Sequence, residues 1–191
     1  MDMNRGFRDA AKTFLPNAKI IIDRFHVVRY CTEAMENVRR SFQKTLPKAQ
    51  RKYFKRSRRL LLVHRDRLSE EDRATVDVML RFSDRLLQAY ALKEAFYDFM
   101  EAPSCGEAER LMDFWLEACD RLNLPEFKPC RKMLANWRPY ILNAFDIRLS
   151  NGFTEGCNNA IKTLKRLAFG FRSFPAFRAR ILLAARAHPY I

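Results

Sequence analysis

Residues Ile20 to Ile22 are the one convincing run of β-branched residues in a sequence that is otherwise patterned for helices. They lie in an expected strand from Ala18 to Ile22, and a continuous apolar strand of this kind is typical of the interior of an α/β sheet, where both faces are covered. A single strand cannot bury itself, so we expect its sheet partners to lie outside this chain or before Met1. With only 5 glycines and long segments of helical periodicity, the rest of the sequence predicts a mainly α protein.

Helices are predicted on both sides of this strand from apolar spacing, capping residues and prolines. Ser69 and Ser104 each begin a capping-box pattern, so each is expected to start a helix. The aromatic and methionine stripes of these segments are most simply explained as core. The predicted helices cover residues 3–15, 27–46, 69–100, 104–122, 134–145 and 175–187.

The segment 150–171 is predicted to be a helix with two unlike faces, bounded by Asn151-Gly152 and by Gly170 at a C′ position. Its apolar stripe consists of Cys157, Ile161, Leu164 and Ala168. Its polar stripe, roughly 160° away around the helix, consists of Glu155, Asn159, Lys162 and Arg166. The polar stripe is either an ordinary solvated face or a site that needs its one carboxylate. Periodicity alone favours the solvated face; the glycines and asparagines make a poor helix start, which shifts the balance toward the second interpretation without deciding between the two.

The sequence carries a large excess of positive charge, with 36 Lys and Arg against 22 Asp and Glu, a net charge of +14 and a pI near 10.0. Nucleic acid is the usual partner for such a surplus, although a ribosomal or membrane-surface protein would share it. The charge is densest between Arg39 and Arg67, where the only acid is Asp66. Contact with the phosphate backbone is favoured over an unpaired surface arm. The candidate contacts are Arg39, Arg40, Lys44, Lys48, Arg51, Lys52, Lys55, Arg56, Arg58 and Arg59.

Other classes of site are excluded by spacing. The five cysteines and three histidines are scattered without metal-ligand spacing, and the cysteines are expected to be free thiols in a reducing compartment. No apolar run approaches the ~18 residues of a membrane span, and no secretory signal is present. We therefore expect a soluble, cytoplasmic protein without a membrane partner.

Three acidic residues stand out by position: Asp2, Asp23 at the end of the expected strand, and Glu155. Carboxylates from distant parts of a sequence can together hold Mg²⁺, which prefers oxygen ligands and supports phosphodiester chemistry. For Asp23, the N-cap of the following helix is an equally good explanation.

Three pieces of the sequence carry a specific resemblance: DMNRGF at Asp2 to Phe7, LPNAKIIIDRFHV at Leu15 to Val27, and NGFTEGCNNAIKTLKRLAFGFR at Asn151 to Arg172. They closely resemble the bacterial DDE insertion-sequence transposases of the IS-L-three group. The likeness runs in order over essentially the whole chain, although the helical middle matches mainly in character.

The resemblance implies a Mg²⁺-dependent enzyme that cleaves and transfers DNA strands in transposition. It implies the C-terminal part of an RNase H-like α/β core that is interrupted by an all-helical insertion. Residues 1–26 would belong to the core, 27–149 to the insertion, and 150–191 to the C-terminal core helices that carry the catalytic Glu. The expected partners are double-stranded DNA of the element ends and target, and the resemblance is compatible with a homo-oligomer of the intact protein. The expected location is the bacterial cytoplasm, at the nucleoid.

The resemblance also assigns individual residues. Asp2 matches the second catalytic Asp and Glu155 the catalytic Glu, and both would be metal ligands. The residues that match signatures beside the site, or lie on its polar face, are Asp23, His26, Asn158, Asn159, Lys162 and Arg166.

The family's first catalytic Asp and its DNA-binding segment have no counterpart in these 191 residues. We therefore expect no strand transfer from this polypeptide alone. The alternatives are a non-catalytic basic helical DNA-binding module, as in a decayed transposase remnant, and a structural or oligomerisation piece.

Overall fold

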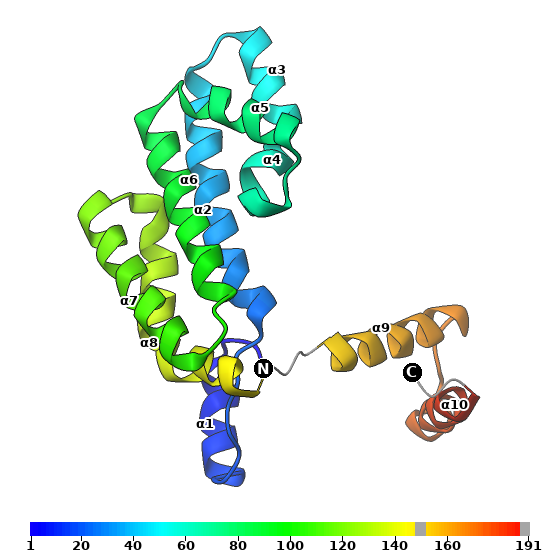
Figure 1. Ribbon diagram of the computed structural model, residues 1–191. Helices are drawn as coiled ribbons and strands as arrows, with labels where there is room; N and C mark the ends of the chain where they lie inside the picture. The colour runs from blue at the N-terminus through cyan, green and yellow to red at the C-terminus, as the bar shows by residue number, and fades with distance from the viewer. Residues whose placement is uncertain (148–151, 188–191) are drawn as a thin grey trace. The chain divides into compact units, whose positions relative to one another are not determined.

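The computed structural model describes residues 1–147 and 152–187, with the backbone alone described at 147, 152–155 and 186–187 (Figure 1). Helices account for most of these residues, and no strand occurs among them, so the mainly α prediction is confirmed. The chain forms two compact units, Met1–Arg148 and Leu149–Ile191. The turn expected at Asn151-Gly152 falls partly outside the described residues.

The first unit is built around four long helices that pack side by side: α2, α6, α7 and α8 (Figure 1). The shorter helices α3, α4 and α5 lie together at one end of this bundle. The elements of the unit are α1 (Arg5–Phe14), α2 (Arg24–Thr45), α3 (Lys48–Arg56), α4 (Arg58–Leu62), the 3₁₀ turn η1 (Arg65–Arg67), α5 (Glu70–Leu80), α6 (Asp84–Met100), α7 (Cys105–Leu122), the 3₁₀ turn η2 (Pro125–Phe127) and α8 (Lys128–Ile147).

The core of the first unit lies between these four helices. The predicted apolar stripe of α2 is buried along its length, from Val27 to Val38. On the facing helices, the ring of Phe96 meets that of Trp115 edge-on with centroids 5.3 Å apart. The buried indole of Trp115 donates from Nε1 to the carbonyl of Leu92 at 2.7 Å, so its polar atom is satisfied. The stripes predicted to be core are therefore core.

Capping serines set the helix starts. Ser69 accepts a hydrogen bond from Asp72 N and Ser104 from Glu107 N, which confirms both predicted starts. The prediction of one uninterrupted helix from residue 69 to about 100 is wrong, because the chain breaks after α5. There Ser83 accepts a bond from Leu86 N and starts α6. A serine that caps a new helix offers the backbone an alternative to continuing the previous one.

The predicted strand is not formed in the described residues; residues 18–23 are irregular. Ile22 is buried, but its N–H donates to Tyr140 O, and Ile20 O accepts from Asn143 Nδ2, so the segment is tied to α8. The amino group of Met1 donates to Ile21 O at 2.7 Å, and the carbonyl of Met1 accepts from Asp23 N at 3.0 Å. This alternation is that of a single parallel β-pair. A pair of that length is too short to count as a sheet.

The helix α1 forms where it was predicted, but its apolar side is not packed against the core. Its expected apolar side includes Phe7 and Phe14, yet no residue of α1 is buried and these two rings are largely exposed. The helix is held at its start, where Asn4 accepts bonds from Gly6 N and Phe7 N.

The second unit consists of α9 (Gly152–Leu167) and α10 (Phe174–Ala187). The ring of Phe171, in the connection, packs on Phe177 of α10 with centroids 4.9 Å apart. The predicted apolar residues Cys157, Ile161 and Leu164 are partly buried, whereas Ala168 is exposed because it lies past the end of α9.

The end of α9 is a Schellman motif: Gly170 N donates to Lys165 O and Phe169 N donates to Arg166 O, both at 3.0 Å. The left-handed C′ residue is thus Phe169, with φ 52°, and Gly170 follows at φ 97°. The prediction placed Gly170 at C′, one residue too late. An aromatic residue in this conformation costs about 1–2 kcal/mol, because its Cβ approaches the following carbonyl.

Candidate catalytic and nucleic-acid sites

Asp2 and His26, from two separate sequence motifs, are in contact. His26 Nε2 lies 3.0 Å from Asp2 Oδ1, and the Asp2 side chain is 56% exposed. His26 is in the first turn of α2, and the bond from Asp23 N to Met1 O holds the preceding residue against the same helix end. The structure therefore brings Asp2, Asp23 and His26 to the N-terminal end of α2.

Asp23 caps α2. Its Oδ1 accepts a hydrogen bond from Phe25 N at 2.8 Å, so the N-cap explanation is confirmed. Asp2 keeps an exposed carboxylate of the kind that Mg²⁺ binds. Among the described residues, however, no group of three His, Cys, Asp or Glu side chains could hold a metal ion. The side chain of Glu155, the other predicted ligand, lies outside the described residues.

The basic stretch does not form a single surface. Arg39 is 4% exposed; it donates to both oxygens of Glu36, to Gln43 Oε1 and to Phe54 O. It cannot contact phosphate in this fold, and that prediction is wrong for Arg39. Arg40 and Arg58 also pair with Glu36, and the guanidinium of Arg51 donates to the carbonyls of Leu46 and Lys44.

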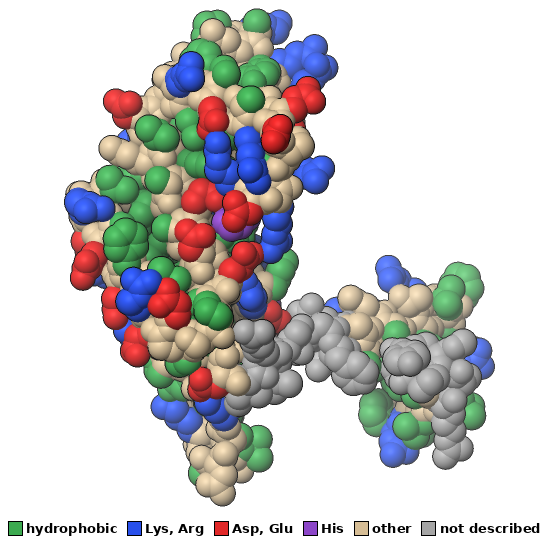
Figure 2. All heavy atoms as spheres, viewed as in Figure 1, with side chains coloured by type: hydrophobic (Ala, Val, Ile, Leu, Met, Phe, Trp, Pro, Cys, Tyr) green, Lys and Arg blue, Asp and Glu red, His purple; other side chains and the backbone are tan. Residues whose placement is uncertain are grey.

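The remaining candidate cations stay free for a partner. α3 turns Phe54 inward, onto Phe42 and Phe82 at centroid distances of 5.3 and 5.9 Å. At about 100° per residue, Lys48, Lys52 and Lys55 then face away from the core. Figure 2 shows Lys and Arg side chains over the end of the first unit that α3 forms. The exposed cations of the stretch, which make no ion pair within the described residues, are Lys44, Lys48, Lys52, Lys55, Arg56 and Arg59.

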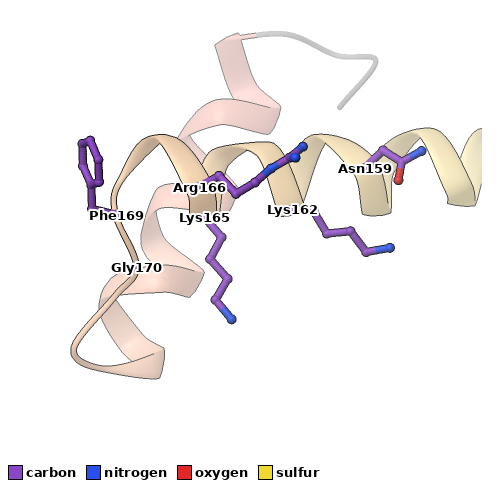
Figure 3. Close-up of a pocket in the computed structure, with 6 residues that line it drawn as sticks. All are labelled: Asn159, Lys162, Lys165, Arg166, Phe169 and Gly170. Atoms are coloured by element: carbon purple, nitrogen blue, oxygen red, sulfur yellow. The ribbon is translucent and has the colours of Figure 1, made fainter.

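On α9 the predicted polar stripe is exposed where it is described. Asn159, Lys162 and Arg166 of the stripe are exposed, and so is Asn158 beside it. Figure 3 shows Arg166 lying along the helix toward Asn159, with Lys162 and Lys165 reaching out from its flank and Phe169 at its end. These residues and Gly170 line an open hollow of about 780 Å³.

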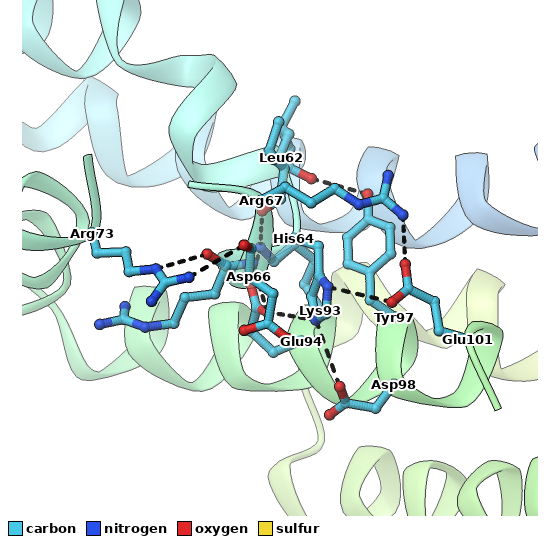
Figure 4. A network of polar contacts seen from close by, with 12 residues as sticks. Leu62, His64, Asp66, Arg67, Arg73, Lys93, Glu94, Tyr97, Asp98 and Glu101 are labelled. Carbon is cyan, nitrogen blue, oxygen red and sulfur yellow. Dashed lines mark hydrogen bonds and ion pairs between the residues drawn. The ribbon is translucent and has the colours of Figure 1, made fainter. Parts of the chain in front are cut away.

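A buried polar network in the first unit escaped the sequence analysis (Figure 4). Lys93 is completely buried; its ammonium pairs with Glu94, donates to Val63 O at 2.7 Å and lies 3.9 Å from the ring centre of Tyr90. Burial lowers the pKa of Lys93, and Glu94 partly offsets this. Lys93 lies seven residues after Leu86 and three before Phe96, on the apolar stripe of α6; that position is the signal that could have revealed it.

The same network encloses His64. Its Nε2 lies 3.3 Å from Glu94 Oε2 and 3.5 Å from Asp98 Oδ1. Tyr97 donates to Leu62 O at 3.0 Å, and burial raises the pKa of this phenol to about 12. These contacts join α6 to the segment between α4 and η1. The role of the network is therefore structural.

No helix within the described residues combines the length and the apolar character needed to cross a membrane. No solved structure matches the chain. A family model for DDE transposases of the ISL3 group, described as "Transposase", matches residues 1–181.

Curated relatives agree with the family model. The chain is 29% identical over 187 residues to the transposase for insertion sequence element IS1001 of Bordetella parapertussis, covering 96% of this chain and 46% of the relative. It is 31% identical over 196 residues to the transposase for IS1557 of Mycobacterium tuberculosis, covering 91% and 44%. A protein of Lactococcus lactis named "ATP-dependent protease" is 34% identical over 117 residues, which cover 61% and 35%. The chain thus spans just under half the length of the first two relatives, and it belongs to the ISL3 family of DDE transposases.

Proposed function

We propose that this chain contributes acidic residues and a DNA-binding surface to a transposase that cleaves and joins the ends of an insertion sequence with Mg²⁺. The observation that carries this proposal is the contact between Asp2 and His26. These residues come from the two N-terminal pieces that resemble the family, 24 positions apart, and they meet at one helix end. Two motif residues in contact are better explained by a shared site than by separate structural roles.

Asp2 and Glu155 would hold the metal, which when bound activates a hydroxyl nucleophile and stabilises the leaving oxygen. His26 is a positioning residue in this proposal: its contact with Oδ1 fixes the Asp2 carboxylate and leaves Oδ2 for a ligand. Asp23 supports the arrangement by capping α2, which carries His26. Asn158, Asn159, Lys162 and Arg166 would position the phosphates of the strand.

We further propose that residues 1–26 and 150–191 belong to an RNase H-like core and that residues 27–149 are its helical insertion. The helical bundle from α2 to α8 supports the insertion. The parallel pair between Met1 and the segment 21–23 supports the core, because parallel pairing is typical of the sheet of an α/β fold. In this arrangement the cations of α3 would bind the DNA backbone without reading its sequence.

The test is element excision by the transposase as the insertion sequence encodes it, with Asp2→Asn and Glu155→Gln. Each variant should abolish Mg²⁺-dependent strand cleavage while the protein still binds element-end DNA. His26→Gln should reduce cleavage only partly, since it removes a positioning contact. Asp9→Asn, an exposed acid on α1, is the matched control and should leave cleavage unchanged. Normal cleavage by Asp2→Asn or Glu155→Gln would refute the assignment.

A second function is favoured by the free cations of α3: a basic helical module that binds DNA without cleaving it. In that case the 191-residue chain binds duplex DNA with strong salt dependence, and Glu155→Gln changes nothing. Excision assays separate the two functions, because only the first requires the carboxylates.

A further inference from the structure

We propose that Phe169, with Lys162, Lys165 and Arg166, forms a binding site for an unpaired nucleotide of DNA. The base would stack on the Phe169 ring, and the phosphates on either side would bind the three cations. This inference rests on the proposed function for its choice of DNA as the ligand. The Phe169 ring would add an aromatic recognition element to a site whose other groups act through charge.

The first observation is the conformation of Phe169. Its φ of 52° lies in the left-handed region, where residues other than glycine, asparagine and aspartate are rare. Gly170 is the next residue and suits that conformation better, yet the helix ends one residue earlier. Backbone strain of this kind is concentrated at functional sites, where the placement of a side chain matters more than local stability.

The second observation is exposure. The Phe169 ring is fully exposed, so no packing within the second unit offsets the strain. Among the described residues, no other exposed aromatic residue has a positive φ; Phe174, at the first turn of α10, is 72% exposed. Phe169 is thus strained and unpacked at once, which points to a ligand outside the unit.

The third observation is the charge around the ring. Lys162, Lys165 and Arg166 follow the i, i+3, i+4 spacing that places them on one side of α9, and Phe169 continues it one turn further. All are exposed and line the same hollow (Figure 3). Within the described residues, their charged groups make one hydrogen bond, from Arg166 Nη2 to Thr163 Oγ1, and residues 156–185 contain no acid. The hollow therefore favours an anion.

An aromatic face beside several cations is the combination that binds single-stranded nucleic acid. A base within a duplex is already stacked on both sides, so it presents only its edges and cannot cover the Phe169 ring. An unpaired base, at a cut end or in a distorted duplex, has a free face. Duplex DNA could still bind the three cations through its phosphates, and Phe169 would then contribute little.

The test measures binding of the 191-residue chain to a single strand of about 12 nucleotides and to the duplex of the same sequence. Phe169→Ala should weaken single-strand binding by about 5- to 150-fold, the range for one stacked base. It should leave duplex binding nearly unchanged. Phe174→Ala is the matched control for loss of an exposed ring, and it should affect neither.

A direct probe of stacking is Phe169→Trp. This variant should restore single-strand affinity, and its emission should be quenched by the single strand but not by a strand that lacks bases. The other two tryptophans, Trp115 and Trp137, are buried in the first unit. An unquenched indole at position 169 would overturn the proposal, as would equal effects of Phe169→Ala and Phe174→Ala.

The stacking site and the DNA-binding function can be refuted separately. If Lys162→Ala and Arg166→Ala weaken binding but Phe169→Ala does not, the stacking site is refuted and the DNA-binding function stands. If the chain binds neither form of DNA, the proposed function fails as well. If Phe169→Ala changes only self-association, the ring is a protein contact and the nucleotide site is wrong.

Discussion

Arg39 donates from Nε to Oε2 of Glu36 at 2.7 Å, and both side chains are almost completely buried on α2. The same guanidinium donates to Phe54 O on α3, so it joins the two helices. Glu36 in turn accepts from Arg40 and Arg58 on the surface. One carboxylate thus neutralises part of the most basic segment of the chain and anchors it to the core.

The first prediction concerns the stability of this pair. Arg39→Ala leaves Glu36 buried without its inward partner and removes the link to Phe54 O. We expect it to lower the free energy of unfolding by about 3–5 kcal/mol, as measured by urea denaturation. Arg40→Ala removes an exposed partner of the same carboxylate and should cost less than about 1 kcal/mol. Equal losses for the two variants would contradict the structural role of Arg39.

The second prediction concerns acid. Burial opposes ionisation of Glu36, but the hydrogen bonds and charges of Arg39 and Arg58 outweigh it and lower its pKa from 4.5 to about 2. A carboxyl group with a depressed folded-state pKa stabilises the fold above its unfolded value and loses that contribution as the pH falls through the folded value. Glu36 should therefore contribute on the order of 3 kcal/mol at neutral pH, lost progressively between about pH 4.5 and 2. Unfolding free energies measured across that range should fall less steeply for Glu36→Gln.

The sequence predicts that positive charge is dense in this region. It does not predict which cations are buried, which pair with Glu36 and which stay free on the surface. Arg39 lies four residues after Met35 and beside Val38, on the buried stripe of α2, so the spacing alone could have placed it inside. That Arg58 returns to Glu36 depends on the turn between α3 and α4, which no local pattern specifies. That the cations of α3 are exposed can be inferred only once Phe54 is known to face inward.

The features that depend on local sequence were predicted better than those that depend on distant contacts. The caps at Ser69 and Ser104 are set within one helical turn, and both were correct. The strand predicted at residues 18–22 does not form in the described residues: the segment makes one β-type pairing with Met1, and its groups at Ile20 and Ile22 bond to α8. The contact of Asp2 with His26 requires the fold, although the resemblance had marked both residues. The pairing of Asp2 with Glu155 remains a prediction.

The third prediction concerns DNA binding by α3. The triple variant Lys48→Gln, Lys52→Gln and Lys55→Gln should flatten the plot of log affinity against log salt concentration by up to about 3 units of slope, since each phosphate contact contributes about 0.9. Its melting temperature should stay unchanged, because these side chains are exposed and make no ion pair in the described part of the chain. The measurement is duplex binding over a series of salt concentrations.

The matched control for that variant removes the same charge elsewhere: Arg121→Gln, Lys128→Gln and Lys132→Gln, exposed cations on α7 and α8. It should leave the slope nearly unchanged. If both triple variants lower affinity alike, general charge rather than a defined α3 surface binds the DNA.

The fourth prediction sets local stability against binding at the end of α9. Phe169 occupies the left-handed C′ position with a fully exposed ring, so glycine there should relieve strain without loss of packing. We expect Phe169→Gly to stabilise the Schellman turn by about 1 kcal/mol relative to Phe169→Ala. Exchange of the Gly170 amide, which donates to Lys165 O, should slow by about 5-fold.

Both variants should bind a single strand equally poorly, because both lack the ring. If glycine instead speeds exchange, the Phe169 side chain contributes packing that its exposure does not reveal, and its conformation no longer indicates a ligand.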